Sequence, residues 1–356
     1  MTEPPMLAIG LMSGTSLDGT DAALVRIWGP TRIELIAFAH RPYDRSERAR
    51  IEAVLAGGPI AELARLHTAI AQWSVEAIEM VLVSAHCRAD QLGLIALHGQ
   101  TMWHEPPLVT LQLGAPAILA ERFGVRVVHD FRSRDVAAGG QGAPLVPLVD
   151  ALCFSSEQHP RVLLNIGGMA NATWVPAAGE LSGVVAGDSG PGMAIIDSIA
   201  RLVDPSLPFD SGGRLASEGK VDSGVLEELL ADPYFGAPLP KSTGREHFGV
   251  GYAERLHRRV PGADGVRTAV SLTATTIAEF CTRLLPRASE VIAAGGGTHH
   301  PVLMRELEQH LARHEVELLR FDEQFFDGDA KEAVAFAMLG WLTVHGQPGN
   351  LPEVTG

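Results

Sequence analysis

The sequence predicts an α/β protein made of two similar halves. Short apolar runs of strand composition alternate with longer runs of helical periodicity, which is typical of sheets covered by helices. A strand, a glycine turn and a second strand near residue 7 recur near residue 162, and the strand-glycine unit at 94–101 recurs at 291–298. The halves share few identical residues, so the repeat is one of pattern. A chain of 356 residues has room for two medium domains or one very large one.

Composition and charge exclude several classes of protein. Hydrophobic residues make up 46% of the chain and charged residues 20%, which is typical of a folded globular protein. The net charge of −14 predicts no nucleic-acid partner and no attraction to an anionic membrane. The three cysteines, Cys87, Cys153 and Cys281, form no CxxC pair, which favours free thiols in a reducing compartment. With no signal-peptide pattern, and with the longest apolar run (333–344) too short to cross a bilayer, we expect a soluble cytoplasmic protein.

The first half begins with three strand candidates separated by turn residues, and helices and strands then alternate. The expected strands are 6–12, 21–27, 33–40, 92–101 and 125–131. The expected helices are 46–57, 60–87 and 115–124. Gly124 is a typical helix stop. The loop 132–147, rich in Gly and Pro, is expected to join two domains.

The same pattern then restarts. Strand–turn–strand is expected over 161–176, and a third strand over 182–192 ends in a turn. Helices are expected at 193–203, 268–285, 301–312 and 330–346, and further strands at 289–300 and 316–323, with an irregular insert near 204–265. The predicted domains are 1–131, which the tail 345–356 can join, and 132–344.

The turn in "MSGTSLDGTD" (12–21) is the first candidate for phosphate binding. It has no Gly-Lys-Ser/Thr for a Walker A loop. It also lacks GxGxxG, and a strand rather than a helix follows it, which argues against a dinucleotide fingerprint. A β-hairpin turn that offers amides and hydroxyls to phosphate oxygens fits better, with Asp18 or Asp21 holding a hydrated Mg²⁺. The alternative is that Asp18-Gly19 is only a hairpin signal.

Three further glycine turns strengthen the phosphate reading. "NIGGMAN" (165–171) provides the second side of a phosphate clamp. "DSGPG" (188–192) places Asp188 just past a strand, as a general base, a metal contact or only a cap of the next helix. "AAGGGTHH" (293–300) allows an adenine or ribose to lie against backbone, or is a crowded connection.

Other polar residues are less specific. His98 and His104 lack a recognised metal spacing, so a structural or polar role is expected. Arg132 and Arg134 can bind an anionic substrate group in a bidentate manner, or form a solvated surface pair with Asp135.

These motifs in this order resemble one family, the anhydro-N-acetylmuramic acid kinases of the actin/Hsp70/sugar-kinase superfamily. The resemblance covers nearly the whole chain. The matching segments are 12–21, 98–104, 130–147, 165–171, 188–192, 240–246, 294–297, 329–337 and 348–356.

The resemblance implies two actin-like (ribonuclease H-like) domains with an ATP cleft between them. It implies ATP-dependent conversion of 1,6-anhydro-N-acetylmuramate to N-acetylmuramate 6-phosphate in peptidoglycan recycling, in a cytoplasmic homodimer that uses ATP and Mg²⁺. Asp188 matches the family's catalytic carboxylate, which deprotonates the water that attacks C1.

The resemblance also assigns binding residues. The ATP-binding positions are Gly14, Thr15, Ser16, Leu17, Asp18, Gly19, Thr20, Asp21, Asn165, Gly167, Gly168, Gly295, Gly296 and Gly297. The sugar-binding positions are His98, Arg132, Arg134 and Glu332, with an arginine of the pair on the lactyl carboxylate. Asp18 is the implied Mg²⁺ contact.

Three positions depart from the family pattern, and one segment has no assigned role. Ser189 replaces Thr, and Met193 and His300 each replace Asn. In "PKSTGRE" (240–246), Lys241 and Arg245 either contact a ligand or stabilise the loop. The competing functions are another sugar kinase of the superfamily and a nucleotide-switched filament or chaperone domain.

Overall fold

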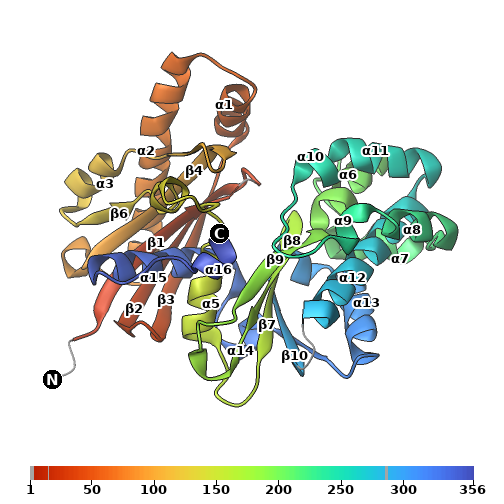
Figure 1. Ribbon diagram of the computed structural model, residues 1–356. Coiled ribbons are helices and arrows are strands. Elements are labelled where there is room, and N and C mark those ends of the chain that lie inside the picture. The colour runs from red at the N-terminus through yellow and green to blue at the C-terminus, as the bar shows by residue number, and fades with distance from the viewer. Residues whose placement is uncertain (1–3, 15, 285–287) are drawn as a thin grey trace. The chain divides into compact units, whose positions relative to one another are not determined.

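The computed structural model describes residues 4–14, 16–284 and 288–356 (Figure 1). The chain forms two compact units, Met1–Phe154 with Ala330–Gly356, and Ser155–Asp329. We call them unit 1 and unit 2 and describe each by itself. Their boundaries differ from the predicted ones because α5 (Val146–Phe154) and α15 (Lys331–Val344) pack together in unit 1. The expected cleft between the units stays a prediction.

Unit 1 is built on a six-stranded sheet of order β3-β2-β1-β4-β5, with β6 paired to β4. Its strands are β1 (Met6–Ser13), β2 (Gly19–Gly29), β3 (Arg32–Pro42), β4 (Leu94–Glu105), β5 (Val109–Leu113) and β6 (Val127–His129). The first three strands are antiparallel, whereas β4 runs parallel to β1 and β6 parallel to β4. Ser13 pairs with Gln100, and Met12 pairs with Asp21. These pairings bring the side chains of Gln100 and Asp21 to the turn after β1.

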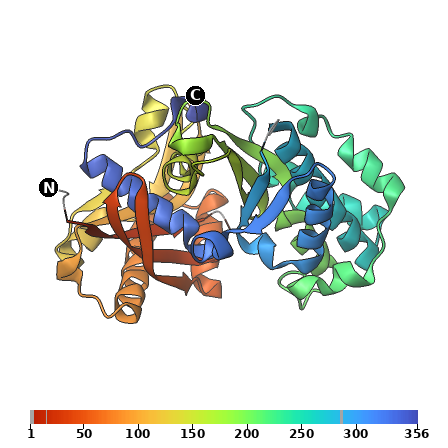
Figure 2. The ribbon, with the colours of Figure 1, turned by 90° about the horizontal axis from the view of Figure 1, so that it is seen from below.

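Helices pack on this sheet. They are α1 (Arg45–Leu55), α2 (Ile60–Ser84), α3 (Pro116–Phe123), α4 (Ser133–Ala137), α5, α15 and α16 (Pro352–Thr355). Helix α2 contacts β2 and β3, and α15 contacts β1, β2 and β4; Figure 2 shows the blue α15 beside the red strands. The approach of α15 is so close that a Cβ on Gly10 would lie 1.9 Å from the Ala333 carbonyl oxygen. Only glycine fits there.

Unit 2 repeats this topology with a sheet of order β11-β10-β7-β8-β9. Its strands are β7 (Arg161–Ile166), β8 (Met169–Val175), β9 (Val185–Pro191), β10 (Glu290–Ala294) and β11 (Glu317–Arg320). The first three are antiparallel, and β10 is parallel to both β7 and β11. Strands β7 and β10 therefore correspond to β1 and β4, which confirms the repeat seen in the sequence.

The helices of unit 2 show one wrong expectation. They are α6 (Met193–Val203), α7 (Arg214–Glu218), α8 (Ser223–Leu230), α9 (Pro233–Gly236), α10 (Arg245–Phe248), α11 (Val250–Arg259), α12 (Ala263–Leu284), α13 (Pro301–Ala312) and α14 (Phe321–Gln324). The stretch 204–265, expected to be irregular, contains α7 to α11. These helices are short. Helices α7 and α8 pack on α12, α10 and α11 pack on α6, and α9 packs on β9, so their order comes from tertiary contacts more than from local periodicity. Residue 285 of the expected helix 268–285 lies outside the described residues.

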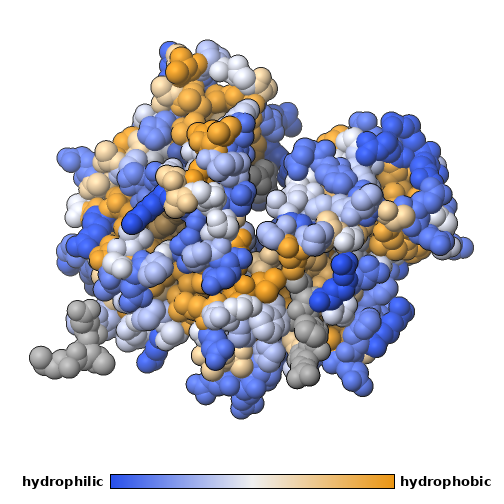
Figure 3. All heavy atoms as spheres, viewed as in Figure 1, coloured by the Kyte–Doolittle hydropathy of each residue, from blue (hydrophilic) through white to orange (hydrophobic). Residues whose placement is uncertain are grey.

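Strand β5 and the helices α4 and α5 were also not expected. A short strand and a loop rich in Gly and Pro give weak local patterns, and β5 is ordered by pairing with β4. Within the described part of the chain, no helix combines the length and apolar character needed to cross a membrane. Figure 3 shows apolar residues at the upper end of unit 1, near the connection of α1 to α2, where Leu55 and Ile60 are exposed.

Candidate functional site

The turn after β1 is held in shape by bonds within itself and to its neighbours. The Ser16 hydroxyl donates to Asp18 Oδ1 (2.7 Å), and the Asp18 carbonyl oxygen accepts from the Tyr43 N–H (2.8 Å). Leu17 is buried with φ of 57°, a left-handed conformation that is uncommon outside glycine. Asp18 stays exposed. Thr15 lies outside the described residues.

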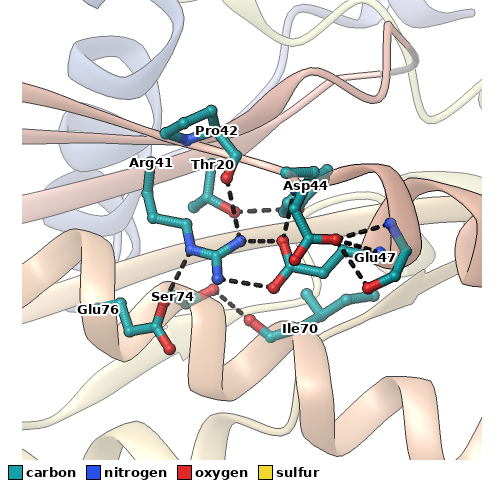
Figure 4. Close-up of polar contacts among 10 residues, drawn as sticks. Thr20, Arg41, Pro42, Asp44, Glu47, Ile70, Ser74 and Glu76 are labelled. Atoms are coloured by element: carbon teal, nitrogen blue, oxygen red, sulfur yellow. Dashed lines mark hydrogen bonds and ion pairs between the residues drawn. The ribbon is translucent and has the colours of Figure 1, made fainter.

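Arg41 supports the far end of this turn (Figure 4). Its Nη2 donates to Glu47 Oε1 (2.7 Å), its Nη1 also pairs with Glu47, and its Nε donates to Glu76 Oε2 (2.8 Å). These contacts raise the pKa of Arg41. A Cβ on Gly19 would lie 2.4 Å from the Arg41 carbonyl oxygen, so the close approach of the two strands requires glycine. Gly19 is thus explained by packing.

Gln100 supports the candidate site and is not among the residues that the sequence predicted. Its side chain is fully buried, and its Nε2 donates to the Gly14 carbonyl oxygen (3.1 Å). The bond fixes the start of the turn from the neighbouring strand β4. The signal was present in the "HGQT" motif, where Gln100 follows His98 by two residues on the same strand face.

His98, Arg132 and Glu332 are brought together in unit 1. His98 Nε2 accepts from Arg132 Nε (3.1 Å) and Nη2 (2.9 Å), and its Nδ1 lies 2.6 Å from the Gly99 carbonyl oxygen. Because a guanidinium only donates, the histidine is neutral with its proton on Nδ1. Burial and the Arg132 charge hold the pKa of His98 well below its usual range. Burial lowers the pKa of Arg132 to about 10, opposed by the charge of Glu332.

Asp18 and Asp21, the acidic residues of the turn after β1, affect the pKa of Glu332 in the same cluster. Burial raises the pKa of Glu332, and the charges of Asp21 and Asp18 raise it further. Arg132 opposes this effect. Asp21 Oδ1 also lies 2.6 Å from His40 Nδ1. The predicted residues His98, Arg132, Glu332, Asp18 and Asp21 thus belong to one charged cluster, whereas Arg134 is exposed.

The same charges bear on metal binding. Among residues 4–14, 16–284 and 288–356, no three or more His, Cys, Asp or Glu side chains are grouped to hold a metal ion. Mg²⁺ usually needs only one or two carboxylates besides substrate phosphates. The carboxylate of Asp18 is exposed and can supply one such ligand.

Asp135 ties the C-terminal tail to the Arg132 loop. Its carboxylate accepts from the Gly142 N–H (2.6 Å), the Thr355 hydroxyl (2.8 Å) and Asn350 Nδ2. The Gly142 carbonyl oxygen in turn accepts from Arg132 Nη1 (2.8 Å). Asp135 is therefore occupied by the tail, so it does not form the surface pair considered as an alternative for the two arginines.

In unit 2, the glycine turn between β7 and β8 packs on the start of α6. The Gly168 carbonyl oxygen accepts from the Gly192 (2.9 Å) and Ala194 (3.0 Å) N–H groups, and that of Gly167 from the Met193 N–H (2.8 Å). Met193, where the family has Asn, is the first residue of α6 and contributes its backbone here.

The turn after β10 is packed against the same region. Gly295 has φ of 88°, and a Cβ there would lie 2.4 Å from Asn165 Oδ1. A Cβ on Gly297 would lie 2.3 Å from Ile166 Cγ2. The predicted residues Asn165, Gly167, Gly168, Gly295, Gly296 and Gly297 thus lie at two adjoining turns.

His300, the other departure from Asn, has a structural role. It caps α13, with Nδ1 accepting from the Leu303 N–H (3.1 Å), and its Nε2 lies 3.2 Å from Asp210 Oδ2. It is 3% exposed, so both ring nitrogens are occupied inside the protein. Ser189, the third departure, keeps a buried hydroxyl that donates to the Ala170 carbonyl oxygen (3.1 Å).

Asp188 lies inside β9, where it does not cap α6. Its Oδ2 accepts from the Thr243 N–H (2.9 Å), its own N–H donates to the Lys241 carbonyl oxygen (3.1 Å), and its carbonyl oxygen accepts from the Tyr234 hydroxyl (2.9 Å). Burial raises the pKa of Asp188 to about 6, against the Thr243 bond and the Lys241 charge, and Glu246 adds to the rise. A carboxylate with this pKa is ionised at neutral pH and basic enough to take a proton.

Comparison with known proteins extends over the whole chain. A family model described as "Anhydro-N-acetylmuramic acid kinase" matches residues 6–356. Proteins of that name from Gloeobacter violaceus and Caldanaerobacter subterraneus subsp. tengcongensis are 43% and 37% identical. The alignments cover 99% and 98% of this chain, and 96% and 94% of theirs.

A solved structure shares the fold. The activator of the 2-hydroxyisocaproyl-CoA dehydratase from Clostridium difficile, with bound ADPNP, matches with a TM-score of 0.50, 10% identity and 96% coverage of each chain. At this identity the likeness concerns the fold alone. Each sheet contains three antiparallel strands and a fourth strand parallel to the first, which is itself paired with a further parallel strand, β6 in unit 1 and β11 in unit 2; this agrees with the expected actin-like architecture.

Proposed function

Because this chain belongs to the anhydro-N-acetylmuramic acid kinase family, we propose that it opens 1,6-anhydro-N-acetylmuramate with water and phosphorylates O6. ATP is the phosphoryl donor, and the products are N-acetylmuramate 6-phosphate and ADP. The enzyme acts in peptidoglycan recycling. The observation that carries this proposal is Asp188, a partly buried carboxylate with a pKa of about 6 that a backbone N–H holds in place.

The reaction joins two bond changes through one atom. Asp188 takes a proton from water while the water oxygen bonds to C1 and the C1–O6 bond breaks. The electron pair left on O6 attacks the γ-phosphorus, and the bond from that phosphorus to the bridging oxygen of ADP breaks. Because the leaving oxygen is also the acceptor, the phosphoryl step needs chiefly alignment and charge stabilisation.

Sugar recognition is proposed for the cluster of unit 1. Arg132 is charged and held by His98 and the Gly142 carbonyl oxygen, so its guanidinium is ordered before a ligand arrives. A bidentate contact with the lactyl carboxylate fits that arrangement. Glu332 offers carboxylate oxygens that can accept hydrogen bonds from sugar hydroxyls.

ATP binding is proposed for the glycine turns of both units. The turn 14–21 and the turn at Gly167–Gly168 would bind phosphates, and Gly295–Gly297 would lie against the nucleoside. Mg²⁺ held near Asp18 would neutralise phosphate charge when bound. We also propose that the enzyme is a cytoplasmic homodimer.

A product assay tests this function. The purified protein is incubated with ATP, Mg²⁺ and, in separate reactions, the anhydro sugar, glucose, N-acetylglucosamine or free N-acetylmuramate. We expect ADP and a 6-phosphosugar only with the anhydro sugar. Equal or faster phosphorylation of a free hexose would favour the rival sugar kinase, and ATP turnover without any sugar would favour the nucleotide-switched alternative.

A further inference from the structure

The segment 240–246 packs along β9 and is anchored by Lys241. The Lys241 Nζ donates to the carbonyl oxygens of Tyr234 (3.1 Å) and Phe235 (3.3 Å). It also lies 4.5 Å from the ring centre of Tyr234 and 5.2 Å from that of Phe280. All of these contacts are within the protein, so Lys241 stabilises the segment.

Two backbone bonds set this segment against Asp188. The Lys241 carbonyl oxygen accepts from the Asp188 N–H, and the Thr243 N–H donates to the Asp188 carboxylate. The chain between these two bonds is therefore fixed relative to the proposed base. Arg245 lies two residues after Thr243 and is the first residue of α10, so the position of its backbone is defined as well.

The side chain of Arg245 extends to the glycine turn of unit 2. Its Nη2 lies 3.8 Å from the point that a Cβ on Gly168 would occupy. The residue is exposed, and within the described part of the chain no hydrogen bond or ion pair is found for its guanidinium. The carbonyl oxygens of Gly167 and Gly168 already accept from the N–H groups at the start of α6.

Those bonds also limit the N–H groups that can bind an anion at this turn. The N–H groups of Met193 and Ala194 point at the turn's carbonyl oxygens, so these N-terminal amides of α6 are not available to a phosphate. A charge at this turn has to come from a side chain. Arg245 is a cation located there, and its planar fork matches phosphate oxygens.

We propose that Arg245 binds the γ-phosphoryl group during its transfer to O6. The proposal rests on the function proposed above, and it identifies a catalytic residue in the segment 240–246. The guanidinium stabilises the charge that spreads over the three equatorial oxygens of the group in flight. Thr243 holds the carboxylate of Asp188, and Arg245 supplies the cation, so one short segment positions both groups.

Substitution of Arg245 tests the proposal. We expect Arg245→Gln to lower kcat on the order of 100-fold, as for removal of one donor to a transition-state oxyanion. It should weaken binding of a non-hydrolysable ATP analogue while ADP binding stays unchanged, because ADP lacks the γ-phosphate. Arg245→Lys keeps the charge but loses the fork, and should fall between Gln and wild type.

Arg258→Gln is the matched control. Arg258 lies on α11, 67% exposed, 3.9 Å from Glu254, and its loss should leave all four measurements (kcat, sugar KM, analogue affinity and ADP affinity) at wild-type values. Thermal unfolding should be the same for every variant, since Arg245 has an exposed side chain.

Three results would overturn the role of Arg245. They are an Arg245→Gln enzyme within twofold of wild type in kcat and analogue affinity, an equal loss of analogue and ADP affinity, and a loss confined to the KM of the sugar. The nucleotide-binding comparison needs no turnover. A wild-type protein that forms no 6-phosphosugar would instead count against the proposed function.

Discussion

At the scale of single residues, Asp188 connects stability to the proposed chemistry. Its burial favours the protonated form, and the Thr243 N–H, the Lys241 charge and the solvent-accessible part of the side chain limit that effect. The result is a carboxylate that titrates about 2 pH units above an ordinary aspartate. Such a group is a stronger base than an ordinary aspartate, and its ionised form destabilises the folded protein.

The pH dependence of turnover follows from this pKa. If Asp188 accepts the proton of water, it must be ionised, so kcat should fall about tenfold per pH unit below pH 6. The measurement is kcat with saturating ATP and anhydro sugar from pH 4.5 to 8. A kcat that does not change between pH 8 and pH 4.5 would show that Asp188 is not the base.

Asp188→Asn should abolish turnover but preserve ATP binding, and it should stabilise the fold. The folded pKa lies above the ordinary 3.8, so the wild type loses stability as pH rises from about 4 to 6. Asn does not titrate, so the variant should gain up to about 3 kcal/mol at pH 7 and nothing near pH 4. Denaturant unfolding at both pH values checks this. An equal gain at both would show that the carboxylate charge is not its source.

The sequence motifs indicated candidate site residues, but they did not indicate which residues are joined by hydrogen bonds. The roles predicted for Asp188 and Glu332 stay predictions, whereas the contacts of Gln100 and Thr243 were not foreseen. Gln100 bonds to a residue 86 positions away, and Thr243 to one 55 positions away. Such pairs depend on strand register and loop path, which no local pattern contains.

At the scale of elements, the turn 14–21, which we propose binds phosphate, is supported by α1 and α2 through Arg41. The Arg41 and Glu47 side chains are 14% and 13% exposed, so their pairing is partly shielded from water. Asp44 caps α1 and Glu47 closes its capping box, which fixes Glu47 where Arg41 needs it. A helix start therefore determines the position of the strand end that carries Gly19.

Arg41→Met should destabilise the protein by about 2–3 kcal/mol, because Glu47 would remain partly buried without its cation. It should also raise the KM for ATP by loosening the turn. The checks are denaturant unfolding and initial-rate kinetics. The double variant Arg41→Met/Glu47→Met should lose less stability than the single one. A larger loss in the double variant would mean that the pair is not coupled in this way.

The long elements were predicted well because their periodicity is strong. β1, α2, β7, α6, α13 and α15 lie close to where the sequence places them. The helices α7 to α11 were missed because glycines and prolines divide them into pieces of four to ten residues. Helices this short are marginal alone and form where α6, α12 and β9 cover them.

At the scale of the whole molecule, the same strand topology occurs in both units. In both units the glycine turn between the first two strands is a predicted phosphate site. The strand parallel to the first is also close to a predicted site, because His98 lies within β4 and Gly295 follows β10. Duplication of the topology explains why the glycine turns 12–21 and 165–171 occur at corresponding places, after β1 and after β7. The carboxylate proposed as the base occurs only in the second copy.

The C-terminal tail is linked through Asp135 to Arg132, which we propose binds the sugar. Thr355→Val removes the hydroxyl that binds Asp135, so we expect the 139–142 loop and Arg132 to loosen. The KM for the sugar should rise several-fold while the KM for ATP is unchanged. Thr343→Val, whose hydroxyl bonds only within α15, is the matched control. A sugar KM unaltered by Thr355→Val would show that the tail does not hold Arg132.

The central claim is that one enzyme adds water to C1 and phosphate to O6 of the same sugar. It is tested most directly by turnover of 1,6-anhydro-N-acetylmuramate with ATP in ¹⁸O-labelled water, followed by mass spectrometry of the products. We expect one ¹⁸O at C1 of the 6-phosphosugar and none in the phosphoryl group. Label found only in phosphate would contradict it.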